Sequence, residues 1–497
     1  MSSRDVKFLS VFRWPRLSII LFLLVSSVAV CGYSGPESAS PELQTDSLEQ
    51  KTEPADTNLI YEYVAHPILR VLTWPVETFV VPIFETALYP AFPPLKYMNE
   101  AYVLERAIDL ISFGEDNHIM VYPTMVIATG TGSLTGFTFR HHAIFGRPSE
   151  RLIFQYRFFV NGNQKVRARL FLNKFGNTRF RMKFSLMHNR IKNEGIPQPQ
   201  QSDIERGHYS DTTTGGGAQV SHPLIEKISA LARIHYRYHD YGSPPLGFKR
   251  VEQDDYFFDF PSNWEQQRGI NQKFHDVTWV LGLGRSTVNN SNIPTKGSEI
   301  AAQWAYHSTT KNHDYHEWDF ILKKYFFLGV EKYAITPKEQ RELGPLTFDK
   351  IKTTLKYKNL KKQIFKRKVI ATQFRLGQSY ELEGHNAPVY ALKSIGNDTP
   401  LRGYGGTPFR DYARAALNIE YRFPVMRLVE GTFFNEYGIV GKSVYSFEPD
   451  FLRNSWGFGA RMARHDIFLF RTQVGFHGLE SDVLKTATVN ITVDTVY

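Results

Sequence analysis

Apolar and charged residues alternate along many segments of this chain, as they do in the segment 413–424. Side chains on a β-strand point alternately to its two faces, so one face of this segment is apolar and the other is charged or polar. The polar face carries Arg414, Asn418, Glu420 and Arg422. The same alternation recurs in the segments 165–172, 179–186, 227–239, 277–285, 300–307, 318–327 and 370–376. Repeated strands of this period predict an all-β protein.

Alternation alone does not distinguish a soluble sheet from a transmembrane barrel, because each has one apolar and one polar face. In lipid, only helices and closed barrels pair every backbone group. For an exported chain the pattern therefore predicts a transmembrane antiparallel β-barrel. The long segments 190–221, 241–271 and 329–366 lack a clear alternation, and we expect them mainly in extracellular loops.

The C-terminal strand favours the barrel. Tyr497 ends the chain, and Val493, Ile491 and Val489 share its strand face. A terminal aromatic residue with alternate apolar residues before it resembles the signal by which the insertion machinery recognises bacterial outer-membrane proteins. We assign this signal to Val493 and Tyr497. The pattern predicts an integral protein of the bacterial outer membrane, with its lipids and the insertion machinery as partners.

Residues 1–31 resemble an export signal peptide. Basic residues precede an apolar run from Leu17 to Val30, which is shorter than a membrane span. Cys31, the only cysteine, follows directly. Its position resembles a bacterial lipoprotein signal, although Val30 departs from the small residue usual there. Lipidation at Cys31, cleavage nearby and an uncleaved anchor helix remain as alternatives.

Two further segments precede the barrel. Residues 32–57 are rich in Ser, Pro, Glu, Asp and Thr and are predicted to form a disordered acidic linker. Residues 58–113 carry apolar residues at helical spacing with several interrupting prolines, and they predict a short helical, amphipathic pre-barrel segment. This segment lies either on the membrane surface or against its own protein. The barrel is predicted over residues 114–497.

Composition excludes several other classes. Aromatic residues make up 14% of the 497 residues, which suits a barrel with aromatic girdles. The mean hydropathy of −0.32 excludes a bundle of transmembrane helices. The net charge of +10 is spread over alternating strands and forms no basic patch or tail, so we expect no nucleic-acid partner.

The segment after Pro388 resembles a known family. Leu401-Arg402-Gly403-Tyr404, followed by the strand 418–424, is similar to the bacterial surface antigen barrel of the BamA/TamA-type outer-membrane protein superfamily, which also contains two-partner secretion transporters. The resemblance implies a 16-strand barrel whose sixth extracellular loop folds back into the lumen. There, the arginine of an Arg-Gly-aromatic motif meets acidic residues of the inner wall. Arg402, Gly403 and Tyr404 match this motif.

Motifs of the last strands of that family are also matched. The matching residues are Phe434, Glu436, Gly438, Gly457, Gly459, Arg461, Arg471, Gln473 and Gly475. Glu436 and Gln473 stand where the family pattern has aspartates. A buried guanidinium needs a carboxylate partner, and the resemblance implies Glu436 as the partner of Arg402.

The resemblance implies a role in outer-membrane assembly or in protein or lipid translocation, with a protein or lipid cargo. Assembly factors of the family carry periplasmic POTRA domains. The interval 57–114 is too short and too helical for one, so the chain resembles a barrel-only branch.

A passive or anion-selective pore is the alternative function, because a group of cations would face the lumen. Pairing of these cations with acids on opposite strands is the plainer interpretation. The group comprises Arg157, Lys165, Arg167, Arg169, Arg179, Arg181 and Lys183.

An enzyme is a third class. The chain has no Gly-x-Ser-x-Gly elbow, no His-Glu-x-x-His motif and no cysteine nucleophile in the barrel. We interpret the stretch 313–317 as a hydrated loop, since His313 and His316 would lie on opposite strand faces and could not share a metal ion. We predict no enzymatic activity, no cofactor and no metal.

Overall fold

The computed structural model describes residues 112–113, 118–128, 132–147, 150–159, 162–172, 178–195, 208–225, 227–242, 272–289, 294–328, 368–396, 401–404, 409–424, 429–464, 468–478 and 486–494. The predictions for the signal peptide with Cys31, the acidic linker, the helical pre-barrel segment and Tyr497 lie outside these residues. Among the residues described, no helix is long and apolar enough to cross a membrane.

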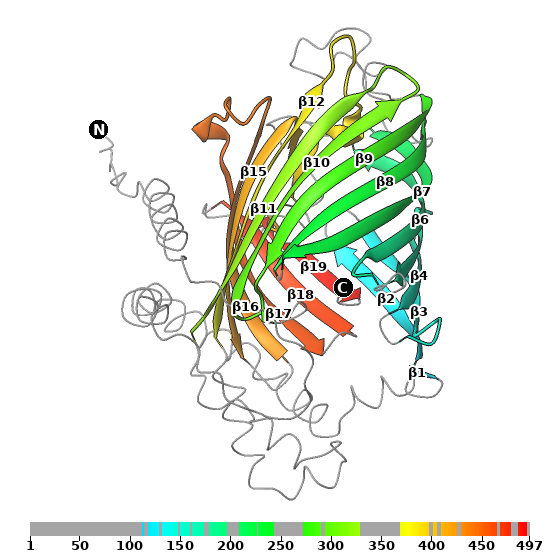
Figure 1. Ribbon diagram of the computed structural model, residues 1–497. Coiled ribbons are helices and arrows are strands. Elements are labelled where there is room, and N and C mark those ends of the chain that lie inside the picture. The colour runs from blue at the N-terminus through cyan, green and yellow to red at the C-terminus, as the bar shows by residue number, and fades with distance from the viewer. Residues whose placement is uncertain are drawn as a thin grey trace, which may run out of the picture. The chain divides into compact units, whose positions relative to one another are not determined.

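Antiparallel strands make up nearly all of the described structure (Figure 1). The main sheet has 17 strands, of which the short β1 (Ser112–Phe113) pairs with the start of β2. The other 16 are β2 (Ile119–Ala128), β3 (Gly132–His142), β4 (Arg151–Phe159), β5 (Gln164–Leu172), β6 (Arg181–Gly195), β7 (His208–Ile225), β8 (Ile228–Gly242), β9 (Lys273–Ser286), β10 (Gly297–Thr309), β11 (Tyr315–Phe327), β12 (Val369–Glu381), β15 (Ala413–Pro424), β16 (Val429–Gly441), β17 (Arg453–Arg464), β18 (Phe468–His477) and β19 (Thr488–Asp494).

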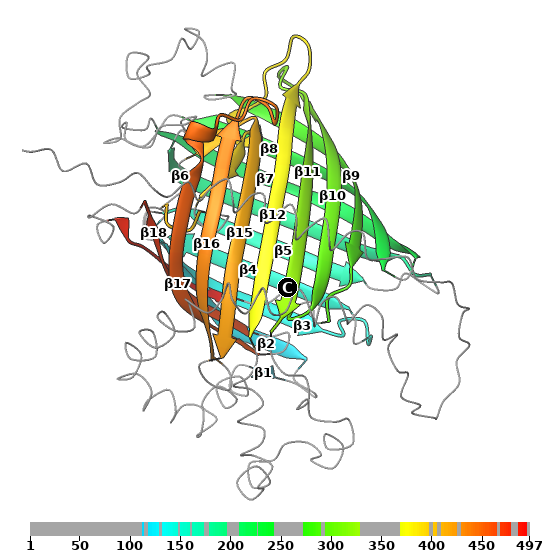
Figure 2. The same cartoon turned by 90° about the vertical axis from the view of Figure 1, so that its left-hand side faces the viewer.

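These 16 strands form a barrel. Each pairs with the next one along the sheet, and β19 returns to pair with β2, so the sheet closes on itself. Figure 2 looks onto the wall formed by β9–β12 and β15–β17, with β2–β5 behind it. The predicted all-β, 16-strand antiparallel barrel is confirmed.

The two faces of the barrel wall differ in polarity. Large apolar side chains are exposed on the outer face; they include Phe158, Phe184, Leu186, Ile234, Trp279, Leu281, Leu283 and Trp304. The inner face buries polar and charged side chains, among them Thr138, Gln155, Asp276, His307, Glu420 and Glu436. The alternation in the sequence is therefore that of a sheet that is apolar outside and polar inside.

The prediction that residues 190–221 lie mainly in a loop was wrong. β6 extends to Gly195, and β7 begins at His208 and pairs with β6 and β8 along its length. β7 carries Thr212–Thr214 and Gly215–Gly217 and so has no apolar alternation of its own. Side chains of the neighbouring strands cover its glycines: Leu186 of β6 lies over Gly216, and His235 of β8 lies over Gly217.

The stretch 313–317 is not a hydrated loop. His313 is 3% exposed, and β11 begins at Tyr315, which is 1% exposed. His313 Nδ1 lies 2.8 Å from the backbone oxygen of Asn386, so this stretch binds the 382–412 loop.

A loop of residues 382–412 connects β12 to β15. Its described parts contain the 3-10 turn η7 (Val389–Ala391) and the strands β13 (Lys393–Ile395) and β14 (Phe409–Asp411), which pair with each other. Ile395, Leu401 and Phe409 of this loop pack against Ala416 of β15 and Val440 of β16. These two strand positions share the inner face with Glu420 and Glu436, so the described parts of the 382–412 loop lie within the barrel. A second 3-10 turn, η8 (Pro449–Phe451), precedes β17.

Candidate functional site

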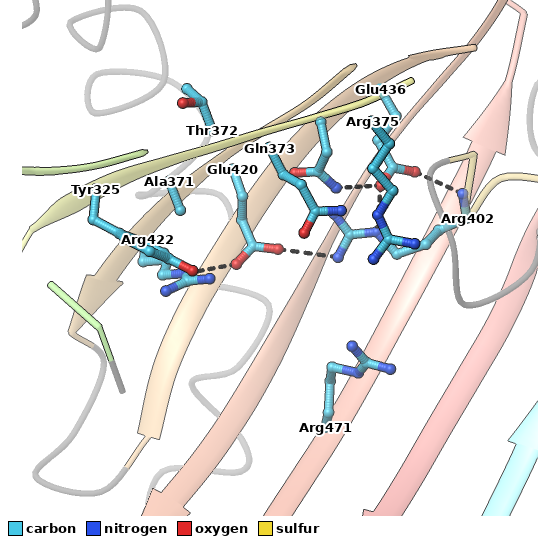
Figure 3. Close-up of a pocket in the computed structure, with 11 residues that line it drawn as sticks. Tyr325, Ala371, Thr372, Gln373, Arg375, Arg402, Glu420, Arg422, Glu436 and Arg471 are labelled. Carbon is cyan, nitrogen blue, oxygen red and sulfur yellow. Dashed lines mark hydrogen bonds and ion pairs between the residues drawn. The ribbon is translucent and has the colours of Figure 1, made fainter. Parts of the chain in front are cut away.

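We call residues 401–404 the tip of the 382–412 loop. Glu436 of β16 accepts most of the hydrogen bonds that the tip donates (Figure 3). Its side chain is fully buried. It accepts hydrogen bonds from the backbone N–H groups of Leu401 (2.9 Å) and Arg402 (2.6 Å) and from Arg402 Nε (2.8 Å). Ser455 Oγ donates at 3.0 Å, and Asn418, which lies opposite in the register of β15, donates through Nδ2. Five donors therefore satisfy this carboxylate, which is the condition for burying it.

Arg402 has a second carboxylate partner. Its Nη1 donates to Glu420 Oε2 at 3.0 Å, and Glu420 also accepts from Arg422 Nε at 2.6 Å. The Arg402 guanidinium carbon lies 3.7 Å from the centroid of the Phe434 ring, which adds a cation–π contact. Burial alone would lower the pKa of Arg402, but the carboxylates of Glu436 and Glu420 outweigh burial and raise it. The arginine therefore keeps its charge inside the barrel.

At the loop tip the backbone is strained at Leu401, and strand β18 lies very close to it at Gly403. Leu401 has φ +89°, in a region that residues with a Cβ rarely adopt, at a cost of about 1–3 kcal/mol. A Cβ on Gly403 would lie 2.2 Å from the backbone oxygen of Phe476, so only glycine fits there. Thr488 Oγ1 of β19 donates to the Arg402 carbonyl at 2.6 Å. The tip is thus held from β16, β18 and β19 together.

Tyr404 also contacts the wall. Its ring stacks on His477 of β18, with centroids 4.3 Å apart and an interplanar angle of 19°. His477 Nδ1 donates to the carbonyl of Gly403 at 2.8 Å. Tyr404 also makes a T-shaped contact with Phe409, with ring centroids 5.1 Å apart.

Three of the predicted glycines make room for these contacts. A Cβ on Gly475 would lie 2.8 Å from the carbonyl group of Arg402, and one on Gly438 would lie 3.1 Å from Leu401. A Cβ on Gly457 would lie 2.5 Å from the ring of Phe434 on the neighbouring strand β16. Gly438 and Gly475 thus mark places where the loop lies directly on the wall, and Gly457 makes room for the Phe434 ring that contacts Arg402.

The remaining predicted residues lie around the site and not at the loop tip. Arg461 pairs with Glu430 across β16 and β17, with nitrogen–oxygen distances of 2.6 and 2.7 Å. Arg471 lines a cavity beside Arg402. Gln473 is buried, its Oε1 finds no hydrogen-bond partner among the described residues, and it packs beside Gly459.

The predicted insertion signal is described only in part. Val493 lies in β19, where its backbone pairs with Phe470 of β18 and Met125 of β2.

A second set of contacts holds the 382–412 loop near its start. Tyr390 donates to the fully buried Asp276 of β9 at 3.2 Å. Lys393 Nζ donates to Glu317 at 2.6 Å and to Asp319 at 2.7 Å, both on β11. Burial raises the pKa of Tyr390 well above its usual range, so its hydroxyl remains a donor. The start of the loop is therefore fixed to β9 and β11.

Sequence reasoning missed five of these partners. They are Glu420, Ser455, His477, Thr488 and Asp276. A signal for Glu420 was present, because it shares the polar face of its strand with Asn418 and Arg422. Within the described part of the chain, no three His, Cys, Asp or Glu side chains are arranged to hold a metal ion.

Comparison with known proteins gives a family and a fold. The sequence model of the Omp85 superfamily domain matches residues 130–477. No curated protein matches the chain.

Similar solved structures include BamA from Haemophilus ducreyi lacking POTRA domains 1–3 (14% identity, TM-score 0.49), CdiB from Acinetobacter baumannii (9%, 0.48) and CdiB from Escherichia coli (12%, 0.45). The matches cover 76%, 76% and 75% of this chain and 70%, 60% and 62% of those chains, respectively. Because the superfamily match spans well over half of the 497 residues, this outer-membrane β-barrel belongs to the Omp85 superfamily.

Proposed function

We propose that the protein acts in outer-membrane assembly or in the translocation of proteins or lipids, and that Arg402 keeps the 382–412 loop in the lumen as a plug. Membership of the superfamily supports the general role. The observation that carries the specific role is the pairing of one buried arginine with Glu436 and Glu420. A buried ion pair adds little stability over apolar packing. Its use here therefore favours a role in fixing the loop at one position from which the loop can be released.

The proposal includes export and insertion of the chain. Residues 1–31 act as the export signal, with Cys31 either lipidated or removed. Val493 and Tyr497 belong to the signal read by the outer-membrane insertion machinery. Outer-membrane lipids surround the barrel, and its cargo is a protein or a lipid. No enzymatic step and no nucleic acid enter this proposal.

Depletion of the protein in its own bacterium tests this role. We expect the amounts of other outer-membrane proteins or lipids to fall, and a wild-type copy to restore them. A copy with Arg402→Ala should fail to restore them. Arg461→Ala is the matched control, because Arg461 pairs with Glu430 away from the loop tip. Heat-modifiable migration on gels shows that each variant barrel is folded. An unchanged outer membrane after depletion would contradict the proposal.

A second candidate, an anion-selective pore, is favoured by one observation. Among the residues that the structure describes, the charged groups that act on Lys183 are Arg169, Arg233 and Arg167, all of them positive. Such a wall attracts anions electrostatically. In planar bilayers with a salt gradient, a reversal potential of the anion-selective sign is expected, and it should change sign when Arg167, Arg169 and Lys183 are replaced together by Glu. Absence of conductance in the wild type removes this candidate.

A further inference from the structure

A hollow of about 710 Å³ lies on the outer face of the barrel wall, over β8 to β12. Figure 1 shows β8, β9, β10 and β11 side by side in this part of the wall. The apolar side chains that line the hollow include Leu281, Leu283, Ala302, Trp304, Trp318 and Phe320. Its volume is in the range of natural ligand pockets, so the hollow is large enough for a ligand.

The register of the strands explains why the wall is hollowed here. Ala302 of β10 pairs with Leu283 of β9 on one side and with Phe320 of β11 on the other. The next residue of β10 on the same face is Trp304, which pairs with Trp318 of β11. A small side chain is thus surrounded by large ones, and Ala302 forms the floor of the hollow.

No charged side chain points into the hollow from the described residues that line it. Asp319 is the one charged residue among them. It lies between Trp318 and Phe320 in the sequence, so its side chain points to the opposite face of the sheet. There it binds Lys393 at 2.7 Å and Arg414 at 2.8 Å. The lining therefore favours an apolar occupant.

The hollow opens toward the membrane. Leu281, Leu283 and Trp304 belong to the exposed apolar face of an outer-membrane barrel, which is surrounded by lipid hydrocarbon. An empty space of this kind would cost the lining side chains their dispersion contacts. A flexible hydrocarbon chain can supply those contacts.

One side of the hollow carries aromatic residues with polar groups. Trp318 Nε1 donates to the hydroxyl oxygen of Tyr380 at 3.3 Å, and Tyr380 is the last residue but one of β12. Ala302, in contrast, lies near the middle of β10. In barrels, Trp and Tyr gather at the level of the lipid headgroups. A lipid with its headgroup beside Tyr380 can therefore place a chain over Ala302.

We propose that this hollow binds one acyl chain of a membrane phospholipid, whose headgroup lies beside Trp318 and Tyr380. In the closed sheet, β9 is the eighth strand counted from β2, and β10 is the eighth counted back from β19. The site is thus as far as the sheet allows from the pairing of β19 with β2, and we assign it to a resident lipid and not to the cargo. The inference rests on the outer-membrane location and not on the proposed role in assembly or translocation.

The test uses the full-length protein, washed in detergent and titrated in micelles with phosphatidylethanolamine whose acyl chains carry bromine. Bromine quenches tryptophan fluorescence on contact, and Trp304 and Trp318 line the hollow. We expect quenching to saturate at one lipid per barrel. Ala302→Phe fills the floor and should raise the lipid concentration for half-quenching about tenfold, the effect of excluding about two methylene groups.

Ala168→Phe is the matched control. Ala168 lies on β5, away from the hollow, and pairs with Leu186, whose side chain is exposed on the outer face. This variant should titrate like the wild type, and heat-modifiable migration verifies that both variants are folded.

Two results would overturn the proposal. Quenching that does not saturate, or that is equal in the wild type and Ala302→Phe, would mean that only bulk lipid covers the hollow. A wild-type dimer in light scattering that Ala302→Phe converts to a monomer would mean that a second copy of the chain covers it. Both measurements are made on the isolated protein, so they are independent of the depletion experiment.

Discussion

Glu436 binds the backbone and the side chain of the loop tip at the same time. Its carboxylate accepts from the N–H groups of Leu401 and Arg402, and it stabilises a Leu401 conformation that is unfavourable on its own. A neutral amide in its place would leave the Arg402 guanidinium with Glu420 as its only carboxylate. The position of the tip and the charge of Glu436 are therefore coupled.

We expect Glu436→Gln to destabilise the docked tip by about 3 kcal/mol, which is typical for removing one partner of a buried ion pair. Amide hydrogen exchange of Leu401 and Arg402 should then accelerate by about a hundredfold. Glu430→Gln is the matched control, because Glu430 loses its pair with Arg461 but does not contact the tip. Equal exchange in Glu436→Gln and the wild type would show that the carboxylate does not hold the tip.

The glycine at 475 predicts a steric effect. A Cβ there would lie 2.8 Å from the Arg402 carbonyl, whereas a Cβ on Gly284 of β9 would have its nearest neighbour at 3.6 Å. We expect Gly475→Ala to destabilise the protein by about 1–3 kcal/mol, the range for overpacking. Gly284→Ala should change stability by less than about 0.5 kcal/mol. Denaturant unfolding in lipid vesicles, followed by tryptophan fluorescence, compares the two; equal stability of both variants would contradict the close approach.

At the scale of single residues, the sequence predicted the motif residues better than the wall residues that contact them. Arg402 and Glu436 stood out because their neighbours matched a family pattern. Ser455, Thr488 and His477 are common polar residues whose role depends on which strands lie beside the loop tip. That proximity is set by the return of the loop into the lumen, which places its tip against β17, β18 and β19. No local pattern in the sequence encodes it.

The 382–412 loop is fixed as an element at two places. Tyr390 and Lys393 hold its start to β9 and β11, and Arg402 holds its tip to β15 and β16. The two sets of contacts share no wall residue. We therefore predict that the start and the tip open separately, although Ile395 packs in the same cluster as Leu401.

Lys393→Met tests this independence. Lys393 is 5% exposed and bridges Glu317 and Asp319, so its loss should accelerate exchange of the Ala391 amide about tenfold. The Arg402 amide should keep its protection, because its acceptor on Glu436 is untouched. Lys323→Met, which breaks a pair between β10 and β11, is the control and should affect neither amide. Acceleration at both amides would show that the loop opens as one unit.

Strands were predictable where their own residues alternate and not where their neighbours supply the apolar bulk. The segments 165–172 and 318–327 are strands for reasons visible in their sequence. β7 is a strand because β6 and β8 pair with it on both sides and cover its glycines. Tertiary context decides such a strand, as it often does for sequences of low β-propensity.

The number of residue pairs that join neighbouring strands varies around the barrel. β7 and β8 pair over fifteen residue pairs, whereas the described parts of β19 and β2 pair over four. Each backbone pair contributes to holding neighbouring strands together, so the β2–β19 seam is the weakest described contact in the wall. On heating, we expect the strands to separate first at this β2–β19 seam.

A disulfide across this seam tests that expectation. Thr492 pairs with Val126 in the register, and antiparallel pairs bring Cα atoms within the range that a disulfide spans. Val126→Cys with Thr492→Cys should raise the temperature at which the folded gel band converts by on the order of 5 °C. Val220→Cys with Ala232→Cys links a register pair of β7 and β8 and is the matched control. That link should have a smaller effect, because fifteen pairs already hold those strands. If both disulfides raise the conversion temperature equally, heating does not start at the seam, and the short pairing of β19 with β2 is compensated by contacts such as that of Thr488 with the loop tip.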